Sequence, residues 1–201
     1  MSPPDRHDPP PRAWQRMLSG RRLDLLDPSP LDVEIEDIAQ GLSRVARWNG
    51  QTRGAHAFSV AAHSLLVEAL MARAKPSSTR AERLCALLHD APEYVVGDMI
   101  SPFKAALGLD YRAFEDRLAR AIRLRFGLPA EMPEALETRI KRADRLSAWF
   151  EATQLAGFAP SEAARLFPRP RGRWAEAVTL EPAPADVARE RFLDRFRRLA
   201  A

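Results

Sequence analysis

The sequence predicts an all-α protein, a helical bundle to which a short N-terminal β-hairpin is added. Apolar residues recur at intervals of three and four along most of the chain, which is the period of an amphipathic helix. Glycine and proline separate these stretches and mark their ends. No segment of about 20 to 50 residues repeats, so a solenoid is excluded. The 201 residues, of which 46% are hydrophobic, suffice for one domain with its own core.

The N-terminal part is expected to hold a flexible tail over residues 1–20, followed by a single domain over 21–201 whose core spans 35–156. Prolines and charged residues dominate the start of the tail, so it cannot bury enough apolar surface to order itself. An alternating stretch at 21–25 leads into a proline turn, and 32–35 can return as the partner strand of a hairpin.

The next segments are expected to form helices over 35–46, 56–73 and 80–90, each with apolar residues at helical spacing. The apolar spacing of the first helix extends to Ala46, and Asn49-Gly50 is the stop signal that follows it, because glycine readily adopts the left-handed conformation after a helix. Thr79 and a glutamate three residues later form the pattern of a capping box, which predicts the start of the third helix.

Pro92 is expected to end the third helix, because proline lacks an amide donor and disfavours helical backbone at the preceding residue. A short helix is predicted to start at Ser101-Pro102, and glycines at 127 and 157 predict the ends of two long helices. The remaining helices are expected over 110–126, 133–156, 161–167 and 184–199.

Composition argues against a nucleic-acid-binding protein and against a membrane protein. The net charge is +4, with 31 basic and 27 acidic residues, but the basic residues are scattered among acids and do not favour nucleic-acid binding. No apolar run approaches the roughly 20 residues that span a bilayer, and no secretory signal pattern opens the chain, so a cytoplasmic protein is expected. The single cysteine, Cys85, lies in an apolar run and is interpreted as an inert core residue.

The adjacent pair His89-Asp90 lies at the end of an apolar segment. Burying an unpaired carboxylate is costly, and a divalent cation satisfies an imidazole and a carboxylate together. Further residues of the same kind lie on two other helical segments: His56 and His63 on one, and Asp144 on the other. Such a set can converge on one metal inside a helical bundle. Taken singly, the histidines are ordinary core or partly exposed residues, and each aspartate is an ion-pair partner for a nearby arginine.

Two of these histidines, His56 and His63, are seven residues apart and therefore share one helix face, so only one of them needs to be a ligand. Glu93 follows His89 by four residues and is expected to face the same cavity. A carboxylate beside a metal site is a candidate general acid or base. The alternative interpretation is a surface glutamate at a helix end.

The order of these residues resembles a known superfamily. Residues 56–144 resemble the HD-domain metal-dependent phosphohydrolases, whose name describes the adjacent His-Asp pair. Within them, 89–104 resembles the bacterial 5′-deoxynucleotidases, which have His-Asp, a Glu three residues later, Gly-Asp and Pro-x-Lys in this order. The resemblance covers roughly residues 40 to 155 and implies an HD-type helical bundle.

The resemblance implies four metal ligands and one catalytic residue. The ligands are His56, His89, Asp90 and Asp144, and Glu93 handles the proton of the attacking water or the leaving group. It also implies a set of nucleotide contacts. Asp98 contacts the deoxyribose, and the pair Arg47-Trp48, which precedes the first ligand, holds the nucleotide. Lys104 is the lysine of the Pro-x-Lys motif and the last of these contacts.

The chain departs from the family pattern around its first ligand. The family has Glu-His-Ser, whereas this chain has Ala55-His56-Ala57. His56 is preferred because His-Ala-Phe-Ser-Val-Ala fits the family's His-Ser-Leu-x-Val-Ala. His63 remains the alternative, as the ligand itself or as a residue that supports the ligands.

The expected function is therefore that of a metal-dependent phosphohydrolase. It would remove the 5′-phosphate of deoxynucleoside monophosphates by attack of a metal-bound hydroxide, with Mn, Co, Fe or Ni preferred to Zn as the cofactor. An HD-domain triphosphohydrolase or pyrophosphohydrolase is the alternative enzyme, and a non-catalytic helical nucleotide- or nucleic-acid-binding protein is the alternative outside enzymes. The resemblance implies a homodimer with a small-molecule nucleotide as substrate.

Overall fold

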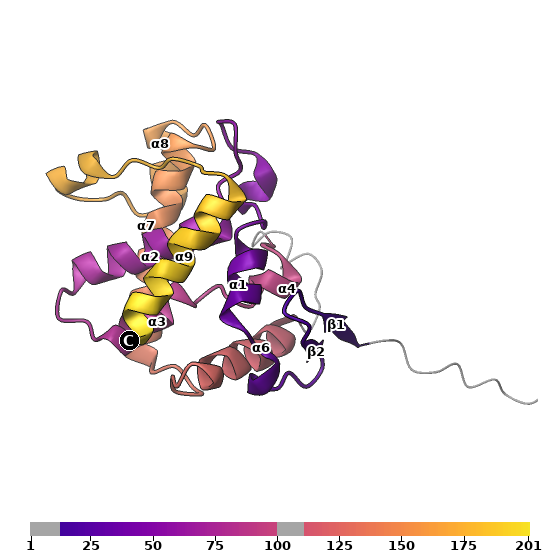
Figure 1. Ribbon diagram of the computed structural model, residues 1–201. Coiled ribbons are helices and arrows are strands. Elements are labelled where there is room, and N and C mark those ends of the chain that lie inside the picture. The colour runs from indigo at the N-terminus through magenta and orange to yellow at the C-terminus, as the bar shows by residue number, and fades with distance from the viewer. Residues whose placement is uncertain (1–12, 100–110) are drawn as a thin grey trace, which may run out of the picture.

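A computed structural model describes residues 13–99 and 111–201 of the chain (Figure 1). In these residues the predicted fold class is confirmed, because helices form a bundle and a two-stranded antiparallel sheet precedes them. The helices are α1 (Ile35–Leu42), α2 (Val60–Ala74), α3 (Arg80–Leu87), α4 (Glu93–Val96), α6 (Tyr111–Arg125), α7 (Glu134–Gln154), α8 (Pro160–Leu166) and α9 (Ala185–Ala200). Short 3-10 turns lie at η1 (Pro30–Asp32), η2 (Arg47–Gly50) and η3 (Arg173–Ala177).

The N-terminal hairpin is present, but its strands are not the predicted pair. Strand β1 (Trp14–Arg16) pairs with β2 (Arg22–Asp24), and Gln15 lies opposite Leu23. The first strand thus falls in the segment that was expected to be tail, while residues 1–12 lie outside the described residues. The predicted partner at 32–35 is wrong, because Ser29 caps η1 there and α1 begins at Ile35.

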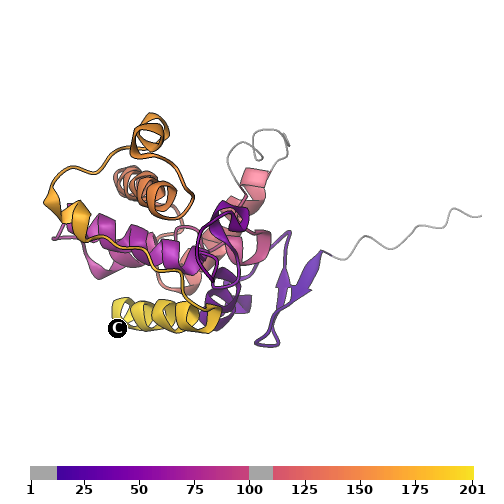
Figure 2. The same ribbon diagram turned by 90° about the horizontal axis from the view of Figure 1, so that it is seen from above.

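The core of the bundle forms around α2, which lies between α7 and α9 (Figure 2). Phe150 of α7, Met71 of α2 and Phe192 of α9 are almost completely buried. Burying one such side chain stabilises the fold by roughly 1.5 to 3 kcal/mol. These contacts fix α2 and α7 against each other, and both helices carry residues of the candidate site.

A break separates α3 from α4, but it begins before the His-Asp pair and not directly after it as predicted. Thr79 and Glu82 form the capping box that begins α3, with the Glu82 amide donating to the Thr79 hydroxyl over 3.1 Å. The helix ends at Leu87, and Pro92 stands directly before α4. His89 and Asp90 therefore occupy a tight turn between two helices, where side chains of adjacent residues can point into the same space.

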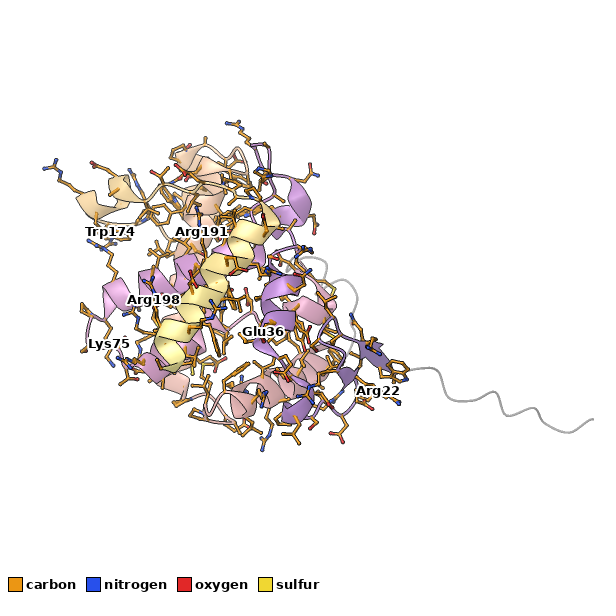
Figure 3. All side chains as sticks on the ribbon, viewed as in Figure 1. Arg22, Glu36, Lys75, Trp174, Arg191 and Arg198 are labelled. Carbon is orange, nitrogen blue, oxygen red and sulfur yellow. The ribbon has the colours of Figure 1, made fainter. Side chains whose placement is uncertain are left out.

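The chain after α7 returns across the bundle. Trp174 of η3 is labelled in Figure 3. Its ring lies 6.1 Å from that of Phe150, and the Arg73 guanidinium stacks over its indole at 4.6 Å. The side-chain amide of Gln154 donates to the Val178 carbonyl over 2.8 Å. Within residues 13–99 and 111–201, no helix combines the length and the apolar character needed to span a membrane.

A close contact between α1 and α4 leads to the first prediction. A Cβ atom on Gly41 would lie 2.7 Å from Cβ of Tyr94 and 2.9 Å from its carbonyl oxygen. We expect Gly41→Ala to lower the free energy of unfolding by about 1 to 3 kcal/mol, although alanine is the better helix former. Urea unfolding measures this, with the exposed Glu36→Ala of the same helix as control. A Gly41→Ala variant as stable as the parent would contradict the packing described.

Candidate metal centre

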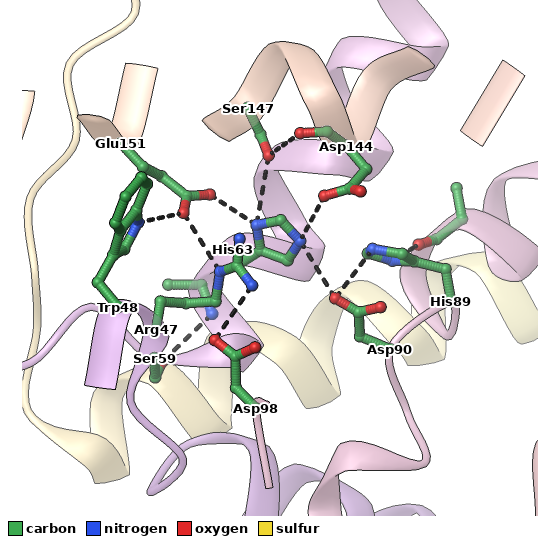
Figure 4. Close-up of polar contacts among 12 residues, drawn as sticks. Arg47, Trp48, Ser59, His63, His89, Asp90, Asp98, Asp144, Ser147 and Glu151 are labelled. Atoms are coloured by element: carbon green, nitrogen blue, oxygen red, sulfur yellow. Dashed lines mark hydrogen bonds and ion pairs between the residues drawn. The ribbon is translucent and has the colours of Figure 1, made fainter. Parts of the chain in front are cut away.

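His63 of α2 lies at the centre of a group of acidic side chains (Figure 4). Its side chain is fully buried. Its Nε2 atom lies 3.2 Å from Oδ2 of Asp90 and 3.3 Å from Oδ1 of Asp144. Asp144 comes from α7, so the packing of α2 against α7 brings the two residues together across 81 positions of sequence.

His89 and Asp90 reach the same place from the turn after α3. The Nε2 atom of His89 lies 3.1 Å from Oδ2 of Asp90, and the His63 and His89 rings are 5.3 Å apart. Potential ligand atoms of His63, His89 and Asp90 all lie within 4.8 Å of one another. One oxygen of Asp90 thus stands between two imidazole nitrogens.

The hydrogen bonds of the two imidazoles indicate which nitrogen is free. Nδ1 of His89 lies 2.9 Å from the Ala86 carbonyl, and Nδ1 of His63 lies 2.6 Å from Oε1 of Glu151. A carbonyl and a carboxylate can only accept, so both Nδ1 atoms carry hydrogen, and Nε2 is the nitrogen of each ring that can offer a lone pair to a cation once it is not protonated. Both Nε2 atoms are buried without a hydrogen-bond partner among the described residues. This donor set fits a divalent cation.

The structure places His63, and not the preferred His56, in this group. His56 is exposed in the loop before α2 and is not part of this group, whereas His63 is. The reason is the helix start: Ser59 caps α2 by accepting from the Ala62 amide, so His56 precedes the helix and does not share its face. A signal for this was present, because His63-Ser-Leu-Leu-Val matches the family's His-Ser-Leu-x-Val more closely than the segment at 56 does.

Arg47 and Trp48, the expected nucleotide contacts, lie on η2 beside the cluster. Nη1 of Arg47 donates to Oδ2 of Asp98 over 3.1 Å, and Nε1 of Trp48 donates to Oε2 of Glu151 over 2.9 Å. Trp48 has a φ of 58° and Asn49 a φ of 49°. Two consecutive non-glycine residues in the left-handed region are strained, and such strain is typical of functional sites.

The indole of Trp48 is also held by aromatic neighbours. The rings of Phe158 and Phe167 lie 5.7 and 6.0 Å from it. Both come from the part of the chain after α7, so this region supports the candidate site. Lys104, the last predicted nucleotide contact, lies outside the described residues.

Glu93, the expected catalytic residue, opens α4 and is only 4% exposed. Its Oε2 atom has no hydrogen-bond partner among the described residues. Burial, together with the negative charges of Asp90 and Asp98, raises the pKa of Glu93 to about 9. The carboxyl group is therefore neutral at pH 7 and able to donate a proton.

Glu151 is a member of the site that the sequence did not predict. It is completely buried, and its two oxygens accept from His63, Trp48 and Arg47. It follows Asp144 by seven residues on α7, two helical turns later and on roughly the same face. That spacing was a usable signal, although the partners of Glu151 lie about 90 to 100 positions away in sequence.

Electrostatics favour a cation at this place. Burial and Arg47 would lower the pKa of His63, but Glu151, Asp144 and Asp90 raise it well above its usual value. Although burial alone would raise the pKa of Glu151, His63 and Arg47 lower it to about 2. The partly exposed carboxylates of Asp90 and Asp144 thus face Nε2 of His63, and the buried Glu151 lies on the opposite edge of the ring.

A cavity of about 790 Å³ opens beside the cluster. His89, Asp90 and Asp144 line it, together with residues of α6. This volume lies in the range of small-molecule sites. The α6 residues include Arg117, Arg120 and Arg123.

The buried carboxyl group of Glu93 leads to a prediction for the metal-free protein. Its pKa rises from 4.5 to about 9 on folding, so the folded state keeps a proton that the unfolded state releases in this window. The free energy of unfolding therefore falls as the pH rises from about 5 to 8, by up to about 1.4 kcal/mol per pH unit from this group.

We expect Glu93→Gln to remove this contribution, so the variant gains stability over the parent as the pH rises. Urea unfolding of both proteins in EDTA at several pH values measures the difference between their free energies of unfolding. The contributions of the other titrating groups are the same in both proteins and cancel in this difference. A stability difference that stays constant between pH 5 and 8 would contradict the burial of an uncharged Glu93.

Comparisons with known proteins place the chain among relatives. No family model matches it. It is 36% identical over 113 residues to the uncharacterized protein YfdR of Escherichia coli, an alignment that covers 56% of each chain. It is 61% identical over 178 residues to the uncharacterized protein RCAP_rcc00048 of Rhodobacter capsulatus, which covers 86% of this chain and 89% of the relative. The chain therefore belongs to the family of RCAP_rcc00048.

Proposed function

We propose that the chain is a metal-dependent phosphohydrolase of the HD type, which removes the 5′-phosphate of deoxynucleoside monophosphates. The observation that carries this proposal is the convergence of His63 and His89 with Asp90 and Asp144, in which both imidazoles turn Nε2 toward the carboxylates. The same residue types in the same order characterise the family that the sequence resembles, with His63 in place of His56.

The four side chains would hold one divalent cation. A set of two nitrogen and two carboxylate ligands suits Mn, Co, Fe or Ni. Structural zinc instead favours closed tetrahedral sites. A bound cation would neutralise phosphate charge and lower the pKa of a water molecule. The side chains of Asp90 and Asp144 are partly exposed toward the cavity, which leaves room for a phosphate group.

Glu93 supplies the proton that the leaving group needs. As the oxygen of water forms its bond to phosphorus, the bond from phosphorus to the 5′-oxygen breaks, and that oxygen must be protonated to leave as a hydroxyl. In the metal-free protein, burial raises the pKa of the Glu93 carboxyl group to about 9, so this group holds a proton more readily than an ordinary glutamate. It is thus suited to act as the general acid.

Arg47 and Asp98 would hold the substrate. They form an ion pair with each other, and both side chains are largely buried. In this proposal Arg47 would brace the phosphate with its remaining guanidinium donors, and Asp98 would accept a hydrogen bond from the sugar 3′-hydroxyl. A carboxylate close to the sugar leaves little space for a 2′-hydroxyl, which favours deoxynucleotides.

The test is phosphate release from a panel of substrates by the purified protein with added Mn²⁺. The panel comprises deoxynucleoside monophosphates, ribonucleoside monophosphates, deoxynucleoside triphosphates and guanosine tetraphosphate. Release from deoxynucleoside monophosphates, abolished by EDTA, is the expected result. Activity on triphosphates or guanosine tetraphosphate alone would replace the proposal with another HD-type reaction. Salt-dependent DNA binding by a protein without metal would replace it with a binding function.

The oligomeric state belongs to the same proposal. The family resemblance implies a homodimer, and light scattering on the eluate of a size-exclusion column measures the mass directly. A mass of one chain, 22.5 kDa, at micromolar concentration would remove the dimer from the proposal.

A further inference from the structure

Glu151 connects two groups of residues that have different tasks in the proposed function. Its Oε1 atom lies 2.6 Å from Nδ1 of the proposed metal ligand His63. Its Oε2 atom accepts from Nε1 of Trp48 over 2.9 Å and from Nε of Arg47 over 3.2 Å. The side chain has no exposed surface, so no water competes for these contacts.

We propose that Glu151 is a positioning residue that couples metal binding to nucleotide binding, because one oxygen orients His63 and the other orients Arg47 and Trp48. The inference rests on the proposed function and extends it to a residue outside the ligand set. The two groups then share a single rigid support on α7, and a change in one is transmitted to the other.

The metal side of this coupling follows from the hydrogen bond to His63. A carboxylate accepts the hydrogen of Nδ1, which fixes the tautomer and leaves Nε2 free to bind a cation. Ser147, whose hydroxyl donates to the Asp144 carbonyl over 2.7 Å, is a second acceptor for this Nδ1, but it is neutral and lies 3.3 Å away, compared with 2.6 Å for the charged Glu151. Glu151 is therefore the principal acceptor for His63.

The nucleotide side follows from the geometry of η2. Trp48 stands in the left-handed region, a conformation that persists only where neighbouring contacts hold it. The bond from its indole to Glu151 is such a contact. The same oxygen accepts from Arg47, whose guanidinium continues to Asp98. Glu151 thus fixes both side chains that precede the first ligand.

Glutamine is the informative substitution, since it keeps the volume of Glu151 but has only one oxygen. All three neighbours, His63, Trp48 and Arg47, present N–H groups. The amide nitrogen of glutamine is a donor, so it must face either His63 or the pair on η2 and lose that bond. Glu151→Gln cannot satisfy both sides at once.

The experiment measures Mn²⁺ affinity by calorimetry without nucleotide, and then KM and kcat for 2′-deoxyadenosine 5′-monophosphate at saturating Mn²⁺. We expect Glu151→Gln to weaken Mn²⁺ binding by about 10- to 100-fold. We also expect KM to stay raised at least threefold when Mn²⁺ is saturating, because Arg47 and Trp48 have lost their support.

Glu68→Gln is the matched control. Glu68 is a buried carboxylate on the same helix as His63, 2% exposed, and it accepts from Arg83 and Arg195 without contact to the site. Its variant loses stability but should bind Mn²⁺ within twofold of the parent. Should Glu151→Gln fail to fold, Glu151→Asp keeps the buried charge but is too short to reach both sides. We expect it to weaken Mn²⁺ binding or raise KM at least threefold.

Unchanged Mn²⁺ affinity and KM in the Glu151 variants would overturn the coupling, and so would an equal loss of affinity in Glu68→Gln. A different result would contradict the proposed function. If the parent binds Mn²⁺ but releases no phosphate, the hydrolase proposal is wrong, while weaker Mn²⁺ binding by Glu151→Gln still supports the role of Glu151 toward His63. A parent protein that binds no Mn²⁺ would overturn both.

Discussion

His63→Ala should abolish Mn²⁺ binding and reduce phosphate release by about 100-fold or more, whereas His56→Ala should leave both unchanged. His63 is buried with its Nε2 facing two carboxylates, and its removal takes away one of four proposed ligands. Loss of a residue that merely supports a ligand already costs about 10- to 100-fold in affinity, so loss of a ligand costs at least as much. His56 is exposed and contacts none of these residues.

The measurement compares bound metal by elemental analysis and turnover for the two alanine variants under identical conditions. His63→Ala leaves the buried Glu151 without its imidazole partner, so circular dichroism must first show that the variant is folded. His63→Gln serves where the alanine variant is unstable, because it fills more of the space and cannot ligate like an imidazole. If His56→Ala lost metal while His63→Ala kept it, the assignment of the ligands would be reversed.

Glu93→Gln should lower kcat by about 10²- to 10⁴-fold while Mn²⁺ affinity changes little. Glutamine resembles the neutral glutamic acid in shape and polarity but has no proton that it can release to the 5′-oxygen. Glu93 is not among the proposed ligands, so the cation should bind as before. The same substitution stabilises the metal-free protein above pH 5, since it removes a buried carboxyl group whose pKa is raised to about 9.

This combination separates a catalytic role from a structural one. A residue needed only for folding would lose activity and stability together, whereas Glu93→Gln should lose activity and gain stability, a trade-off typical of active-site residues. Kinetic and unfolding measurements on one preparation test both parts. Turnover within threefold of the parent would remove Glu93 from the mechanism, and the hydrolase proposal would then need another proton donor.

The helices could be predicted because their signals are local. Apolar spacing, the Thr79 cap and Pro92 each act within a few residues, and α3, α6 and α7 begin and end within three residues of the expected positions. The hairpin is different, since strand pairing depends on which distant segment packs beside it. The stretch at 32–35 alternates like a strand, but the cap at Ser29 and the start of α1 prevail there.

The residues of the candidate site also differ in whether their signals are local in the sequence. His89-Asp90 could be predicted from its apolar surroundings and from Pro92, and Asp144 from its place on an amphipathic helix. His56 was preferred because the segment that follows it fits the family motif, but α2 begins only after its cap at Ser59, so His56 lies outside the helix and away from the group. The spacing of Glu151 from Asp144 places both on one helix face, but the role of Glu151 depends on contacts to His63 and Trp48 that only the packed structure brings about.

Anomalous diffraction from crystals grown with Mn²⁺ tests the shared metal site most directly. We expect one strong peak per chain, bounded by Nε2 of His63, Nε2 of His89 and the carboxylates of Asp90 and Asp144. A peak elsewhere, or none at this position with Mn²⁺ in excess, would contradict the convergence of these residues on a single cation.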